Sequence, residues 1–148
     1  MGQFFDWNGK FNAYVAQDYG FRWNTSHVEG TACRYENLDN YQTGIHDYFK
    51  YIKFGFGRTT DIVSSLVRRR ELDREEGKKL IIKHDGKYGE DIPYYLGKSF
   101  EIILKDIGVS LNEYSETVTN FVNRDLFDIH FRYVPIVTPK FIKDLQDA

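Results

Sequence analysis

Residues 96–122 read LGKSFEIILKDIGVSLNEYSETVTNFV and predict two consecutive helices. Ser110 is followed three residues later by Glu113, the capping-box pattern in which hydroxyl and carboxylate each satisfy a free backbone amide at a helix start. Gly108 just before it is a natural helix end. Apolar residues recur at helical spacing before this break, at Leu96, Phe100, Ile103, Leu104 and Ile107, and after it, at Leu111, Tyr114, Val118, Phe121 and Val122.

The same periodicity predicts helices upstream, where the apolar positions step by three and four. The first of these predicted helices covers about residues 8–19 and the last residues 74–84. Between them lies a helix over residues 45–56, with one apolar face formed by Ile45, Phe49, Ile52 and Phe56. Another helix follows it, marked by Ile62, Val63, Leu66 and Val67. Residues 24–40 are polar and interrupted by Gly30, which predicts a long loop of the kind that is usually functional or disordered.

The carboxy-terminal stretch has a different pattern. Residues 126–137 alternate apolar and polar side chains, which is typical of a strand, although no partner strand is evident. Thr138 and Pro139 predict the start of a short final helix. The predicted fold is therefore mostly α: a single helical domain of about five to seven helices with one short strand near the carboxy terminus.

Composition narrows the class of protein. The 148 residues are 41% hydrophobic and 17% aromatic, which excludes a disordered tail, and the net charge of -2 gives no bulk attraction for nucleic acid or an anionic membrane. Cys33 is the only cysteine, so neither an internal disulfide nor a cysteine-based zinc site is expected. The amino terminus does not have the pattern of a signal peptide, and no apolar run is long enough to span a membrane. We therefore expect a cytoplasmic protein.

An anion site is one hypothesis for residues 46–61. On the predicted helix, His46, Lys50 and Lys53 share the face opposite the apolar stripe. Arg58 follows in a glycine-flanked turn, and the next helix would begin at Thr59 or Thr60, where free amides favour an anion. The alternative is a solvated helix face followed by an ordinary turn.

Other candidate groups are also open to two interpretations. In the loop, His27 and Glu29 are suited to acid–base chemistry, whereas Cys33 is either a nucleophile or a buried thiol. Two potential ligands are too few to predict a metal site. The run Arg68–Arg70 either contacts nucleic acid or complements the dipole at a helix end. Residues 85–87 read as a turn.

Several segments, in order and with similar spacing, give the chain a resemblance to the carboxy-terminal region of the N-acetyl sugar amidotransferase family. These enzymes are relatives of the PP-loop ATP pyrophosphatases of O-antigen and nonulosonic-acid biosynthesis. The resemblance covers about residues 4–125 and leaves residues 126–148 as an unmatched tail, expected to pack on the same domain. The segments are Phe5–Trp7, Tyr19–Trp23, His27–Thr31, Lys53–Arg58, Arg74–Glu76 and His84–Gly86.

The resemblance implies a reaction. Family members convert an acetamido group on a nucleotide-linked sugar to an acetamidino group, in surface polysaccharide (lipopolysaccharide) biosynthesis. ATP, with magnesium, activates the amide oxygen by adenylation, and ammonia from a glutaminase subunit, assisted by a cyclase-like subunit, displaces AMP. The family's ATP-binding PP-loop, Ser-Gly-Gly-x-Asp-Ser, does not occur in this sequence. The chain is thus expected to be a fragment or subunit that needs a separate PP-loop ATPase domain.

The resemblance also implies roles for single residues. His27 and Glu29 would face the reacting amide as catalytic groups, and phosphate or substrate would be contacted by Lys53, Arg58, Thr31 and Lys50. No metal ligands are implied within the chain. Two other functions remain open: a non-catalytic helical module that binds other proteins, and a small nucleic-acid-binding protein that uses Arg68–Arg70.

Overall fold

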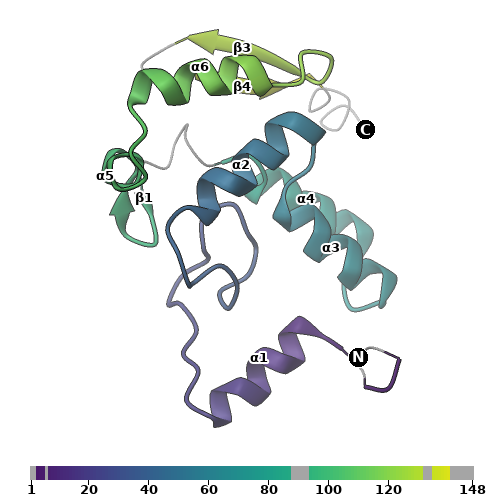
Figure 1. Cartoon of the computed structure of the whole chain (residues 1–148). Coiled ribbons are helices and arrows are strands. Elements are labelled where there is room, and N and C mark those ends of the chain that lie inside the picture. The colour runs from purple at the N-terminus through teal and green to yellow at the C-terminus, as the bar shows by residue number, and fades with distance from the viewer. Residues whose placement is uncertain (1–2, 6, 88–93, 132–134, 141–148) are drawn as a thin grey trace.

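The computed structural model describes residues 3–5, 7–87, 94–131 and 135–140. Within these ranges the chain is mostly helical, as predicted, with six helices and two antiparallel two-stranded hairpins (Figure 1). The helices are α1 (Gly9–Asp18), α2 (Thr43–Phe54), α3 (Arg58–Arg68), α4 (Arg74–His84), α5 (Phe100–Asp106) and α6 (Leu111–Phe121). The strands are β1 (Tyr94–Tyr95), β2 (Lys98–Ser99), β3 (Phe127–Phe131) and β4 (Pro135–Pro139).

Local capping explains where most helices begin. The Ser110–Glu113 capping box is present at the start of α6, as predicted. Asp73 caps α4 by accepting hydrogen bonds from the amides of Glu75 and Glu76. Side-chain oxygens of Asn8 and Ser99 do the same for α1 and α5. These helix boundaries follow from residues within one turn of the helix start.

One hydrophobic core joins α2, α5 and α6 with the start of β3. Phe100 packs edge-on against Tyr114, with ring centroids 4.8 Å apart, and Tyr51 packs against Phe127 at 5.1 Å. The predicted stripes therefore do meet in one core. On α2, however, the buried side chains are Tyr48, Tyr51 and Ile52. The expected stripe residue Phe56 lies beyond α2 and is 40% exposed.

Three expectations about individual residues are corrected. Leu96 belongs to no helix: Leu96 and Gly97 have φ values of 49° and 79° and form the tight turn between β1 and β2, so α5 begins only at Phe100. Phe121 was expected in the core but is 52% exposed. The predicted strand does have a partner, β4, which contains Thr138 and Pro139 in place of the expected helix start.

The long loop before α2 is held by buried residues. Val28 and Thr31 are completely buried, and Cys33 is nearly so. The loop thus packs against the helices and positions neighbouring side chains. Helix α1 lies at the lower end of the view in Figure 1, and its cap residue Asn8 donates a hydrogen bond to Glu71. In the described part of the chain, no helix is long and apolar enough to cross a membrane.

Candidate functional site

Two segments far apart in the sequence meet at the first turn of α3. Gly55, in the left-handed conformation with φ 84°, ends α2 and turns the chain, and Gly57 precedes the first residue of α3. Asp85, which directly follows α4, reaches this turn from 28 residues away. Its carboxylate accepts hydrogen bonds from the amides of Gly57 (2.9 Å), Thr59 (2.9 Å) and Thr60 (3.3 Å), and from the Thr60 hydroxyl (2.6 Å).

Two glycines are needed for this approach. A Cβ atom on Gly57 would lie 2.6 Å from a carboxylate oxygen of Asp85, closer than non-bonded atoms approach. Gly86 has φ 70°, and a side chain there would overlap the ring of Tyr51. Gly57 and Gly86, one from each of the segments 53–58 and 84–86, thus each allow a close approach that a side chain would block.

Asp85 occupies the start of α3, where the sequence pattern predicted that an external anion binds. The free amides at the start of α3 do bind a carboxylate, but it comes from the same chain, so this helix start does not offer an open phosphate site. Burial raises the pKa of Asp85, while its four hydrogen bonds act in the opposite direction. This internal cap corrects the expectation for Thr59 and Thr60.

Arg58 is bound to a carboxylate of α2. Its Nε and Nη2 atoms donate to the two oxygens of Asp47 at 2.5 and 2.9 Å, a bidentate pair. The Asp47 side chain is 12% exposed and that of Arg58 31%. Burial would raise the pKa of Asp47, but hydrogen bonds from Arg58 and His46 outweigh it and hold the pKa below the usual value.

A narrow cleft lies beside this ion pair. It holds only about 10 Å³ of open space, room for about one water molecule. Glu29 lies in its wall and is oriented by a hydrogen bond from the amide of Leu96 (3.1 Å). The lining comes from the loop, α2, the start of α3 and the segment after α4, and consists of Glu29, Gly30, Gly44, Asp47, Tyr48, Gly57, Arg58, Gly86 and Lys87.

His27 lies against His84, with ring centroids 5.1 Å apart. The Nε2 atom of His84 is buried and has no hydrogen-bond partner among the described residues. Burial, together with the charges of His27 and Lys83, lowers the pKa of His84, which favours the neutral imidazole at neutral pH. His27 is exposed, so it is the member of this pair that a ligand can reach.

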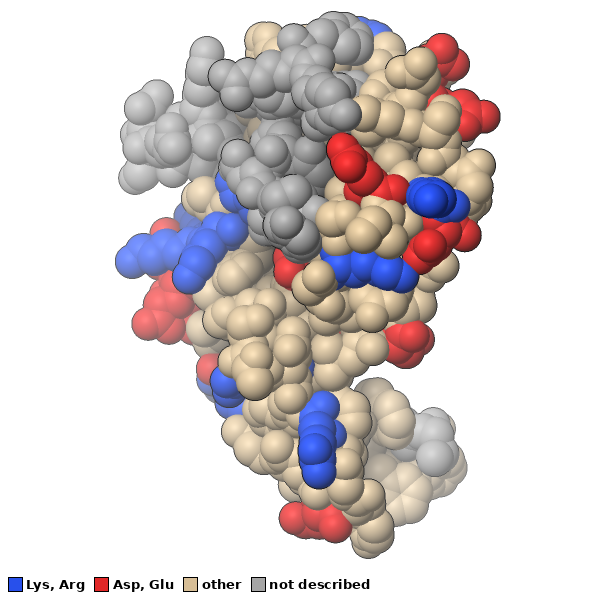
Figure 2. Space-filling model, turned by 90° about the vertical axis from the view of Figure 1, so that its left-hand side faces the viewer, with Lys and Arg blue, Asp and Glu red and all other residues tan. Residues whose placement is uncertain are grey.

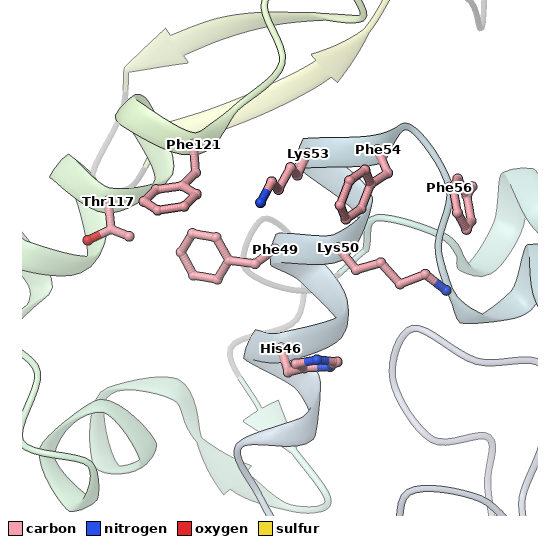
Figure 3. Close-up of a pocket in the computed structure, with 8 residues that line it drawn as sticks. All are labelled: His46, Phe49, Lys50, Lys53, Phe54, Phe56, Thr117 and Phe121. Atoms are coloured by element: carbon pink, nitrogen blue, oxygen red, sulfur yellow. The ribbon is translucent and has the colours of Figure 1, made fainter.

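Lys53 and Lys50 lie on another surface. They line a groove between α2 and α6, with Lys53 directed toward the phenylalanine rings in Figure 3. Lys50 forms an ion pair with Asp61. The expectation that Lys53 and Arg58 share one anion is therefore corrected, because Arg58 turns toward Asp47 while Lys53 stays on the outer face of α2.

Thr31 and Cys33 make their contacts inside the fold. Thr31 is completely buried and its hydroxyl oxygen accepts the amide of Cys33 at 3.1 Å, so it does not reach the surface as a substrate contact. Burial raises the pKa of the Cys33 thiol, which keeps it protonated and opposes a nucleophilic role. Of the candidate residues, Glu29 and Arg58 line the narrow cleft, while Lys50 and Lys53 line the groove between α2 and α6.

Sequence reasoning missed several residues of this region: Asp47, His84, Asp85 and Lys87. His84 and Asp85 belong to a segment that resembles the family, yet residues 85–87 read as an ordinary turn. One signal was available in the sequence, because both segments 53–58 and 84–86 contain glycines. A glycine that is not needed for a turn often marks a place where another part of the chain approaches the backbone closely. No local pattern shows that Asp85 caps a helix 25 residues before it.

The basic run Arg68–Arg70 ends α3. Arg69 donates to the carbonyl of Trp7 at 2.9 Å and lies 3.6 Å from the carboxylate of Glu71. On the face shown in Figure 2, basic and acidic side chains are interspersed and form no continuous basic surface of the kind that nucleic-acid binding needs. In the described ranges, no three His, Cys, Asp or Glu side chains are arranged to hold a metal ion.

Asp47→Asn tests the ion pair at the cleft. We expect a loss of about 1–2 kcal/mol in the free energy of unfolding near pH 7, because the half-buried Arg58 loses its charged partner. The folded-state pKa of Asp47 is lowered, so the pair stabilises above the unfolded pKa of about 3.9 and its contribution is lost as pH falls through the folded pKa. Urea unfolding near pH 7 and near pH 3 should show the difference from wild type shrinking in acid. An undiminished difference at low pH would contradict this assignment.

A comparison with protein families gives one match. The model of the family described as "LPS biosynthesis protein WbpG-like, C-terminal domain" matches residues 29–135. This range begins inside the buried loop and contains every residue that lines the cleft. No curated protein matches the chain.

Proposed function

The chain belongs to the family of WbpG-like carboxy-terminal domains of lipopolysaccharide biosynthesis proteins, and from this we propose that it is one part of an ATP-dependent N-acetyl sugar amidotransferase. In the proposed reaction the amide oxygen of an acetamido sugar attacks the α-phosphorus of ATP and releases pyrophosphate. Ammonia then adds to the activated carbon, a proton is lost, and AMP leaves with the former amide oxygen. The product is an acetamidino sugar.

The observation that carries this proposal is the convergence at the cleft. Glu29, Arg58 and Lys87 come from three segments far apart in the sequence and line one opening. The lining has two carboxylates, Glu29 and Asp47, and two cations, Arg58 and Lys87, with Arg58 paired to Asp47. Acidic and basic groups on one cleft are suited to a reaction in which a proton is removed and phosphate charge develops. His27, beside the cleft segment, is an accessible imidazole that can accept the proton from the attacking ammonia.

The chain does not act alone in this proposal. ATP and its magnesium are held mainly by a PP-loop ATPase domain, whose sequence signature this chain lacks. The narrow cleft has no room for a nucleotide, so it supplies the wall of a site that the other domain completes. Ammonia comes from a glutaminase with a cyclase-like subunit, and the reaction takes place in the cytoplasm on a sugar nucleotide.

ATP turnover by the isolated chain and by the reconstituted pair tests the proposal. Without a PP-loop domain, we expect no conversion of ATP to AMP with any acetamido sugar nucleotide plus ammonium. Adding a separately expressed PP-loop domain from the same family should produce AMP. Release of AMP by the pure chain alone would overturn the fragment interpretation, because the chain would then hold a complete ATP site.

A non-catalytic interaction module is the second candidate. It is favoured by the apolar side chains exposed before the family-matched range, which include Phe4, Phe5, Trp7, Phe11, Tyr14 and Tyr19. Exposed aromatic clusters are typical of surfaces that bind other proteins. A pair that binds tightly but makes AMP equally well when Glu29 is replaced by Gln would favour this alternative.

A further inference from the structure

The groove between α2 and α6 has the composition of a ligand site. Its volume is about 660 Å³, within the range of small-molecule pockets. Two pairs of rings form its walls: Phe49 with Phe121 at a centroid distance of 6.2 Å, and Phe54 with Phe56 at 6.4 Å. Phe54, Phe56 and Phe121 are each at least 40% exposed, so ring faces are open to a ligand.

One cation lies between these walls. The Lys53 ammonium is 5.3 Å from the Phe54 centroid and 5.7 Å from the Phe121 centroid, which places it in the middle of the groove (Figure 3). Among the described residues no carboxylate pairs with Lys53. The other two basic residues of the groove already have partners, since Lys50 pairs with Asp61 and His46 with Asp47. The groove therefore has one positive charge available for a ligand.

We propose that this groove binds a nucleoside phosphate, with the flat base against the phenylalanine rings and the phosphate on Lys53. Stacking on an aromatic ring is favourable for every base because each has a π-face. A base on the Phe54 or Phe121 wall places its phosphate within the reach of the Lys53 ammonium, which is under 6 Å from both rings. An acyl chain or an apolar helix would bury the rings but would leave the ammonium without a counter-charge.

The inference rests on the proposed function in one respect, because a nucleotide-linked sugar supplies such a ligand. It adds to that function the surface on which the nucleotide part of the substrate binds. The groove is separate from the cleft at Arg58, and the two share no lining residue. Nucleotide recognition on one surface and amide activation on another would explain why Lys53 and Arg58 face different openings.

NMR titration of the full chain tests the proposal with UMP, AMP, uridine and inorganic phosphate. We expect at least one nucleotide to shift groove resonances and to bind more tightly than uridine or phosphate. Lys53→Gln should weaken nucleotide binding roughly 10-fold and leave uridine unchanged, whereas Lys53→Arg should retain binding. Phe121→Leu should weaken both nucleotide and uridine roughly 10-fold through lost stacking. Lys105→Gln, an exposed lysine on α5, is the charge control.

Three outcomes would overturn the proposal. Equal binding of uridine and UMP would identify an apolar groove, equal binding of phosphate and UMP would identify a simple anion surface, and no nucleotide binding at millimolar concentration would exclude the site. The result is independent of catalysis. If the reconstituted pair makes product while Lys53→Gln and Phe121→Leu bind nucleotide normally, the groove proposal fails and the function stands. If nucleotide binds as expected but no product forms, the function fails and the groove proposal stands.

Discussion

Replacing Asp85 with Ala should lower the free energy of unfolding by about 3 kcal/mol, since three amides and one hydroxyl lose their common acceptor. These donors lie at the first turn of α3, where no residue of the helix itself provides a side-chain cap. Asp85 is 7% exposed, so water cannot fully replace its carboxylate without local opening. The substitution should also loosen the contact between the segments that bring Arg58 and Glu29 to one cleft.

Asp85→Asn is the matched control for this prediction. It keeps one oxygen acceptor and the side-chain volume, so we expect a smaller loss than for Ala. Chemical denaturation monitored by circular dichroism gives both values. A loss below about 1 kcal/mol for the Ala variant would show that the carboxylate does not organise the site.

Replacing Phe100 with Ala should cost roughly 3–5 kcal/mol, because it removes a large ring from the centre of the core. Phe100 is 8% exposed and packs against Tyr114 of α6, so the cavity lies between α5 and α6. A protein of this size is stabilised by only about 5–15 kcal/mol, so the variant should melt markedly earlier.

Phe11→Ala is the control for Phe100. Phe11 lies on α1 and is 61% exposed, and its removal should change the free energy of unfolding by less than about 0.5 kcal/mol. Thermal melts of both variants make the comparison. A loss below about 1 kcal/mol at Phe100 would mean that the core does not lie between α5 and α6.

Local signals predicted most of the helices. The capping box at Ser110 and the cap at Asp73 both act within one turn, so the sequence near these helix starts contains the information. The prediction was wrong at Leu96, where helical spacing continued across a hairpin turn that only a residue with positive φ can make. Apolar periodicity alone does not distinguish these two conformations.

The candidate site could be predicted only in part. Glu29 and Arg58 were identified because their residue types suit the chemistry, and both line the cleft. The assignment of Lys53 to the same anion failed because the turn at Gly55 directs Arg58 back toward α2. The role of Asp85 depends on tertiary packing between the end of α4 and the start of α3, which no local spacing reveals.

The product of the reconstituted reaction tests the central claim most directly. The chain, a PP-loop domain of the same family, ATP, magnesium, an acetamido sugar nucleotide and isotope-labelled ammonium are combined, and the sugar is analysed by mass spectrometry. The account predicts that labelled nitrogen enters the sugar as an amidine only when both polypeptides are present. Labelled amidine formed equally well by the PP-loop domain without this chain would contradict it.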